Sequence, residues 1–201
     1  MKASRKIPQP DGSAALLVTD IQNDFCPGGA LGVPGCDAII PLVNEYVRLF
    51  ARRGATVIAT RDWHPPAHMS FAAQGGPWPV HCVQGSRGAQ FHPGLSLLSG
   101  ALIISKASDP NKEAYSSFEG TRLAERLRDL GITTVFVAGI ATDYCVRNTV
   151  LDARRLGFQV VVLEDAITGI DASPGDCEKA VRDMREAGAV FTRAAELGLD
   201  A

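Results

Sequence analysis

The chain has 201 residues, 46% of them hydrophobic and 21% charged, and a formal net charge of −2 at pH 7. This composition is typical of a globular protein with a substantial core. The sequence has no run of Lys or Arg, so nothing electrostatic favours a nucleic-acid partner. No apolar stretch approaches the roughly 20 residues that a membrane span needs, so no membrane segment is expected.

The start of the chain and its cysteines indicate a cytoplasmic protein. Residues 1–13 are polar and lack the apolar segment of a signal peptide, so we expect a lead-in there. The length of the chain predicts a single domain, over residues 14–201. The five cysteines are odd in number and lack CxxC spacing, which argues against a disulfide framework and for a reducing compartment. Four of them have no supporting motif and are interpreted as structural: Cys26, Cys36, Cys82 and Cys177.

Six apolar, β-branched runs predict strands, and amphipathic segments between them predict helices. The strands are expected over residues 14–19, 56–60, 101–105, 134–138, 159–163 and 189–192, and the helices over residues 37–53, 121–130, 142–153 and 174–187. This alternation is typical of an α/β protein with three layers, in which helices cover both faces of a mainly parallel, six-stranded sheet. Residues 63–100 show no periodicity but hold all four histidines and several aromatic residues, which favours an ordered, functional segment.

Four polar or reactive side chains lie where predicted strands end. Asp20, Asp62, Lys106 and Cys145 each stand at or just beyond the end of a different strand. The carboxyl ends of parallel strands meet at one edge of the sheet, where ligands bind in such folds. We therefore expect these four residues to lie close together.

Cys145 is the candidate nucleophile. The buried run 134–138 is broken by Gly139, and Thr142 and Asp143 are suitable N-cap residues, so Cys145 falls in the first turn of the next helix. The N–H groups and dipole at that position favour thiolate over thiol. A sharp strand-to-helix turn is also a recurring way to present a nucleophile. Taken alone, a buried structural cysteine explains the same pattern.

Asp20 and Lys106 offer the proton acceptor and the positive charge that a cysteine nucleophile requires. Their alternative roles are a turn cap for the aspartate and a solvated surface charge for the lysine. Spacing alone does not choose between these two interpretations.

Asp62, His64 and His81 form a candidate metal site. Because strand side chains alternate, Asp-x-His at a strand end directs two side chains to the same side, and a distal histidine can complete the site. A carboxylate with imidazoles suits Zn²⁺, Fe²⁺ or Mn²⁺. The alternative is that these are surface loop histidines. His68 lies four residues after His64 and is a possible competing ligand, but His68 and His92 are both left outside the predicted site.

Several long segments of the chain form recognisable motifs. Three of them, LLVTDIQNDF (16–25), ISKAS (104–108) and AGIATDYCVRNTVLDA (138–153), resemble the isochorismatase-like cysteine hydrolases. Four more, NDFCPGGALGV (23–33), RDWHPPAHMSFA (61–72), WPVHCVQGSRGAQFHP (78–93) and YSSFEGT (115–121), make the resemblance strongest to the nicotinamidases, also called pyrazinamidases, within that superfamily. The resemblance covers nearly the whole chain, from Ala14 to Thr192, and it implies an isochorismatase-like fold with a Rossmann-like strand order.

The resemblance also implies a role for each candidate residue. Cys145 would attack a carboxamide carbon, Asp20 would take the thiol proton and deliver it to departing ammonia, and Lys106 would keep both in their charged states. A cis peptide between Ile140 and Ala141 would direct the Ala141 N–H, with that of Cys145, at the developing oxyanion. One divalent metal ion, with zinc favoured, would be held by Asp62, His64 and His81. Aromatic walls for the substrate would come from Phe25, Trp78, Tyr115 and Tyr144, each of which could instead be ordinary packing.

The expected activity is metal-dependent hydrolysis of nicotinamide, and of pyrazinamide, through a cysteine thioester, as a step in NAD salvage. One alternative is another isochorismatase-like hydrolase, acting on a carbamoyl compound or on isochorismate, although such relatives generally lack the metal set. A catalytically idle scaffold would not need Asp20, Lys106 and Cys145 together. A thiol redox protein is disfavoured because CxxC is absent. The sequence does not define the oligomeric state, and a homo-oligomer is compatible with it.

Overall fold

The computed structural model describes residues 7–199, and its centre is a six-stranded sheet. The strands are β1 (Ala14–Thr19), β2 (Thr56–Asp62), β3 (Leu102–Lys106), β4 (Thr134–Ile140), β5 (Gln159–Thr168) and β6 (Val190–Thr192). They are paired in parallel throughout, in the order β3-β2-β1-β4-β5-β6, which confirms the predicted fold class and strand order. Strands β2 and β3 are added on one side of β1, and strands β4 to β6 are added on its other side. The order of the strands therefore changes direction between β1 and β4, which is where a ligand crevice forms in folds of this type.

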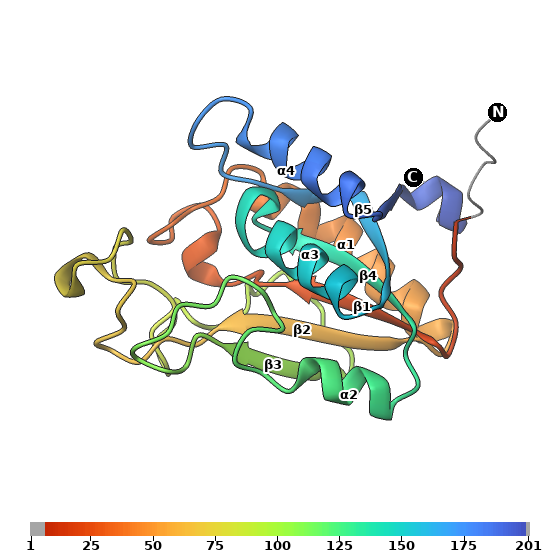
Figure 1. Cartoon of the computed structure of the whole chain (residues 1–201), viewed down its shortest axis with the longest axis horizontal. Helices are drawn as coiled ribbons and strands as arrows, with labels where there is room; N and C mark the ends of the chain where they lie inside the picture. The colour runs from red at the N-terminus through yellow and green to blue at the C-terminus, as the bar shows by residue number, and fades with distance from the viewer. Residues whose placement is uncertain (1–6, 200–201) are drawn as a thin grey trace.

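Helices cover both faces of the sheet (Figure 1). They are α1 (Cys36–Arg52) on one face and α2 (Leu123–Asp129), α3 (Arg147–Arg155) and α4 (Asp176–Glu186) on the other. Every residue of β1 is buried: Leu16 and Val18 face the core under α1, and Ala15 and Leu17 face the opposite core. An apolar strand without polar alternation is what a sheet buried on both faces requires.

The end of β4 has two local features that shape the crevice. Gly139 has φ +109°, and a Cβ there would collide with the carbonyl group of Thr19 on β1, so only glycine fits. Beyond the cis peptide Ile140–Ala141, residues Thr142–Val146 form one turn of π-helix, η3, before α3 begins. The sequence predicted a regular helix from residue 142. Single π-helical turns are frequent at functional sites.

The long segment between β2 and β3 is irregular, as predicted, with one short helix, η2 (Ala72–Gln74). Isolated β-bridges tie it to the rest of the molecule and to itself, among them Gln22 with Phe91 and His64 with Val83. The predicted lead-in over residues 1–13 lies partly outside the described residues; within it, Ile7 packs against the core under α1. Within residues 7–199, no helix has the length and apolar character to span a membrane.

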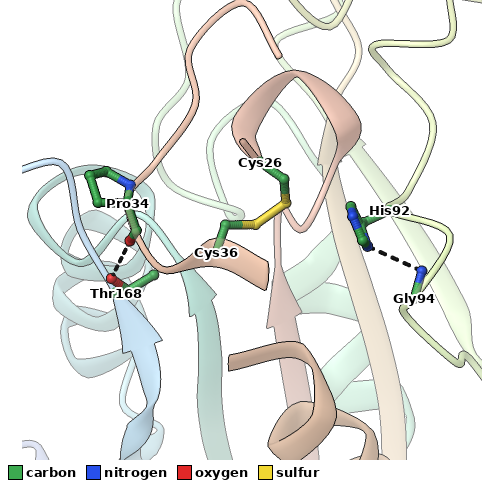
Figure 2. Close-up of a disulfide and its surroundings, with 6 residues drawn as sticks. All are labelled: Cys26, Pro34, Cys36, His92, Gly94 and Thr168. Atoms are coloured by element: carbon green, nitrogen blue, oxygen red, sulfur yellow. Dashed lines mark hydrogen bonds between the residues drawn. A yellow bond between two sulfur atoms is a disulfide. The ribbon is translucent and has the colours of Figure 1, made fainter. Parts of the chain in front are cut away.

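Cys26 and Cys36 form a disulfide that joins the loop after β1 to the first residue of α1 (Figure 2). This corrects the expectation drawn from the odd cysteine count. The two residues are 10 positions apart, and the Gly/Pro-rich loop between them folds back so that their Cα atoms lie 5.2 Å apart. The Thr168 hydroxyl donates to the Pro34 carbonyl at 2.8 Å and fastens the same loop to the end of β5 (Figure 2). The count alone cannot reveal such a pairing.

Candidate active site

The ammonium group of Lys106 lies at the centre of a buried cluster at the carboxyl ends of the strands. Its Nζ is 2.5 Å from Asp62 Oδ1, 3.1 Å from Asp20 Oδ2 and 3.5 Å from Cys145 Sγ. The Ala114 carbonyl accepts a further hydrogen bond from it at 3.1 Å. The four residues at the predicted strand ends are thus brought together, and each is buried.

Burial and the lysine charge oppose each other in this cluster. Burial raises the pKa of the Asp20 carboxyl and of the Cys145 thiol, and the Lys106 ammonium reduces both shifts without cancelling them. Although burial opposes it, the two carboxylates raise the pKa of Lys106, so this residue is charged. The direction of the thiol shift is opposite to the one expected from a helix N-terminus: desolvation is its largest cause, and the charges of Asp20 and Asp62 raise the pKa further. Burial thus raises the proton affinity of both the Cys145 thiol and the Asp20 carboxyl group.

Two buried polar residues position the aspartates, and sequence reasoning missed both. The Thr60 hydroxyl donates to Asp20 Oδ1 at 2.6 Å, which leaves Oδ2 facing Lys106. The Gln22 side-chain amide donates to the Asp62 carbonyl at 2.8 Å, and its oxygen accepts from the Asp62 N–H at 2.7 Å. Gln22 belongs to the LLVTDIQNDF segment, and a buried amide must find such partners.

Asp62, His64 and His81 form the second predicted cluster, with one ligand atom from each residue within 4.8 Å of the others. His64 is 1% exposed, yet neither of its ring nitrogens has a hydrogen-bond partner among the described residues. His81 donates from Nδ1 to the Pro79 carbonyl at 2.8 Å, which leaves the Nε2 lone pair free. An unpartnered buried imidazole beside a second imidazole and a carboxylate fits a divalent metal ion.

A second group of potential ligands, Asp20, Asp62 and Cys145, also lies within 4.8 Å. The Lys106 ammonium contacts all three at 3.5 Å or less and takes the place that a cation would occupy. This group is therefore interpreted as the thiol cluster and not as a metal site.

The two histidines left outside the predicted site form hydrogen bonds of their own. His68 is buried, and its Nδ1 is 2.7 Å from the Ser70 hydroxyl while its Nε2 is 3.0 Å from the Lys112 carbonyl. Its ring lies next to that of His64, with centroids 4.2 Å apart, but both nitrogens have partners. His92 accepts from the Gly94 N–H at 3.1 Å in the neighbourhood of the disulfide (Figure 2), and it is not among the clustered ligand residues.

A pocket opens above Cys145 and the histidine cluster. All four predicted aromatic residues line it: Phe25, Trp78, Tyr115 and Tyr144. The Trp78 indole donates to the Tyr115 hydroxyl at 3.0 Å, and the Trp78 and Tyr144 rings meet edge to face with centroids 5.4 Å apart. Ala141 lies on the wall as well. The structure adds wall residues that the sequence did not reveal: Leu31, Val33, Glu113, Ile140 and Ile170.

Asp143 connects the turn that carries Cys145 to one of these added walls. Its carboxylate accepts hydrogen bonds from the N–H groups of Ile170 at 3.1 Å and Asp171 at 2.8 Å. The prediction that Thr142 or Asp143 caps the helix is wrong, because no side chain caps this π-helical turn at its start. Asp143 instead holds the loop after β5 over the pocket.

A thiol, a carboxylate and an ammonium group at the crevice of a doubly wound parallel sheet are the arrangement of a hydrolase with a cysteine nucleophile. The isochorismatase domain family matches residues 14–196. The chain therefore belongs to the isochorismatase family.

Several individual relatives within this family are similar to the chain over most of its length. A nicotinamidase of Escherichia coli (strain K12) is 42% identical over 198 residues, covering 88% of this chain and 93% of the relative. Among solved structures, a pyrazinamidase of Pyrococcus horikoshii in complex with zinc superposes with a TM-score of 0.87 at 53% identity, covering 90% of this chain and 99% of that one. A protein of L. infantum in complex with nicotinate also has a TM-score of 0.87, at 36% identity over 94% of this chain and 97% of that one.

Proposed function

We propose that this chain hydrolyses nicotinamide to nicotinate and ammonia, with pyrazinamide as a close analogue, through one catalytic domain over residues 14–201. The observation that carries the proposal is the contact of Cys145 Sγ with Lys106 Nζ at 3.5 Å, beneath an aromatic pocket and beside the cluster of Asp62, His64 and His81. A flat heteroaromatic amide suits aromatic walls, and the nicotinamidase and nicotinate-bound relatives support this substrate class.

In the first half-reaction, Asp20 takes the proton from Cys145 as Sγ attacks the carboxamide carbon. Lys106 stabilises the negative charge that passes between carboxylate and thiolate. The N–H groups of Ala141 and Cys145 are the proposed donors to the oxyanion of the tetrahedral intermediate. Asp20 then returns the proton to the amide nitrogen, the C–N bond breaks, and ammonia leaves a thioester on Cys145.

In the second half-reaction, a water molecule attacks the thioester carbon while Asp20 accepts one of its protons. The C–S bond breaks, and the proton returns to the Cys145 sulfur. The carboxylic acid product then ionises in water to nicotinate. The raised pKa of the Asp20 carboxyl, caused by burial, suits a group that must both accept and release a proton at neutral pH.

Asp62, His64 and His81 would hold the divalent metal, and we favour zinc over iron or manganese because one carboxylate with two imidazoles is a common zinc donor set. The zinc complex of the Pyrococcus horikoshii relative supports this choice. When bound, the metal supplies a Lewis acid for the pyridine nitrogen of the substrate. The aromatic walls orient the ring so that its carboxamide faces Cys145.

The deciding experiment measures ammonia release from nicotinamide by the purified protein, before and after treatment with a chelator. We expect turnover in the untreated protein, a strong loss after chelation, and recovery when zinc is added back. Release of ammonia from a carbamoyl compound, with none from nicotinamide, would instead support a different reaction within the same family.

A further inference from the structure

Glu113 places a negative charge on the wall of the pocket above Cys145. The pocket is otherwise mostly apolar, and the carboxylates on its wall are those of Asp62 and Glu113; no lysine or arginine of the described residues lines it. Asp62 is accounted for by Lys106 and by the histidine cluster. Glu113 belongs to neither cluster.

The Glu113 charge is not neutralised by its neighbours. Its Oε1 accepts a hydrogen bond from the Ala114 N–H at 2.9 Å, and within residues 7–199 it has no ion-pair partner. The ammonium group of the adjacent Lys112 is paired with Asp109 instead, with its Nζ 3.9 Å from Asp109 Oδ2. Burial raises the pKa of the Tyr115 hydroxyl, and the Glu113 charge raises it further, so the field of this carboxylate reaches the aromatic wall.

The reaction changes the charge of the molecule in this pocket. The carboxamide that enters is neutral, whereas the carboxylic acid left after thioester hydrolysis loses a proton and becomes an anion. A fixed carboxylate on the wall repels the product and has little effect on the substrate. We propose that Glu113 is a specificity-determining residue that disfavours anionic ring carboxylates relative to neutral carboxamides and thereby promotes product release.

The size of the effect follows from the position of Glu113. It is partly exposed, so solvent weakens the repulsion relative to a fully buried pair. We expect discrimination of about fivefold between the anionic and the neutral ligand, on the order of one charge–charge interaction near a protein surface.

The test compares three variants by steady-state kinetics. Glu113→Gln removes the charge but keeps an oxygen that can accept from the Ala114 N–H, and Glu113→Asp keeps the charge. Glu119→Gln is the matched control, because Glu119 is an exposed carboxylate in the same loop that accepts from the Ser116 N–H at 3.2 Å and does not line the pocket. For each protein, the inhibition constant of nicotinate is divided by the KM of nicotinamide.

This ratio should fall about fivefold in Glu113→Gln and stay within about twofold of wild type in Glu113→Asp and Glu119→Gln. A change in pocket shape would move both constants together and leave the ratio constant, so an unchanged ratio in Glu113→Gln overturns the inference. An equal fall in Glu119→Gln overturns it too, because the effect would then belong to the overall charge of the loop. The inference rests on the proposed amidohydrolase reaction: a wild-type protein without turnover of nicotinamide refutes that reaction, whereas turnover with an unchanged ratio refutes only the role of Glu113.

Discussion

Lys106 Nζ lies 2.5 Å from Asp62 Oδ1, so a single ammonium group joins the thiol cluster to the candidate metal cluster. Asp62 therefore belongs to both clusters: it forms an ion pair with Lys106, and one of its carboxylate oxygens lies within 4.8 Å of the potential ligand atoms of His64 and His81. Removing the charge of Lys106 or of Asp62 leaves the other charge buried without a partner, which lowers the stability of the protein. The two clusters can thus be tested separately only through residues that each holds alone.

Asp20 is such a residue for the thiol cluster. Asp20→Asn keeps the shape but removes the proton acceptor, so the rate of nicotinamide hydrolysis should fall by about 10²- to 10⁴-fold. Lys106→Ala should also be severely impaired, through loss of the charge that stabilises the thiolate. Steady-state ammonia release measures both effects, and bound metal, measured by mass spectrometry, should be retained in Asp20→Asn. A rate within tenfold of wild type, about 1.4 kcal/mol of barrier, would remove Asp20 from the role of general base.

The free thiols should differ in reactivity and in its pH dependence. Burial raises the pKa of Cys177 to about 11, and burial also raises the pKa of Cys82 well above its usual range. The rate of alkylation of Cys177 should therefore increase about tenfold per pH unit between pH 7 and 9, because the thiolate is the reactive form and its fraction rises in proportion below the pKa. Burial raises the pKa of Cys145 as well, but Asp20 is placed to accept its proton as the sulfur attacks, so Cys145 should be labelled first at pH 7.

Peptide mass spectrometry after brief treatment with iodoacetamide locates the adducts. Labelling of Cys145 should be slowed by nicotinate, and Cys145→Ala should abolish turnover while keeping the melting temperature close to that of wild type. Loss of activity in step with modification of Cys82 or Cys177 would contradict the assignment of the nucleophile.

The metal cluster is expected to recognise the ring nitrogen of the substrate. Benzamide has the shape of nicotinamide without that nitrogen, so the wild-type protein should strongly prefer nicotinamide. His64→Ala or His81→Ala should lose bound metal and most of this preference, because the remaining two ligands hold a divalent ion weakly. His92→Ala is the matched control, since His92 bonds to Gly94 outside the cluster.

Both amides are assayed for ammonia release with each variant, and metal content is measured on the same samples. Comparable rates on nicotinamide and benzamide in the metal-loaded wild-type protein would show that the metal has no part in substrate recognition.

The disulfide between Cys26 and Cys36 should stabilise the oxidised protein. It closes a loop of sequence separation 10, for which loss of chain entropy in the unfolded state corresponds to about 2–3 kcal/mol of unfolding free energy. A reducing agent should thus lower the melting temperature of wild type, and Cys36→Ala should show the lowered value with or without the reductant. If reductant shifts the melting temperature of Cys36→Ala as much as that of wild type, the disulfide is not the source of the stabilisation.

The sequence by itself determined the sheet and the residues at its carboxyl edge. The reason is that the periodicities of strands and helices are visible within short segments of the sequence. The run AALLVT of β1, for example, is apolar without polar alternation and so predicts a strand that is buried on both of its faces. Once the strands are parallel, topology brings their ends together, so the positions of Asp20, Asp62, Lys106 and Cys145 along the chain were enough to assign them to one edge. The segment that contains His64 and His81 carries no periodicity. The Asp-x-His pattern at the end of a strand suggested these histidines as metal ligands, and the resemblance of the segments 61–72 and 78–93 supported that choice.

Only the tertiary structure decided what depends on how loops return to the sheet. Glu113 and Ile170 reach the pocket from loops without periodicity, and the contact of Cys26 with Cys36 depends on the path of the loop between them. The direction of the pKa shift of Cys145 was also decided there. A helix N-terminus predicts a lowered thiol pKa from sequence, but the desolvation that raises it comes from groups far apart in the chain that pack around one sulfur atom.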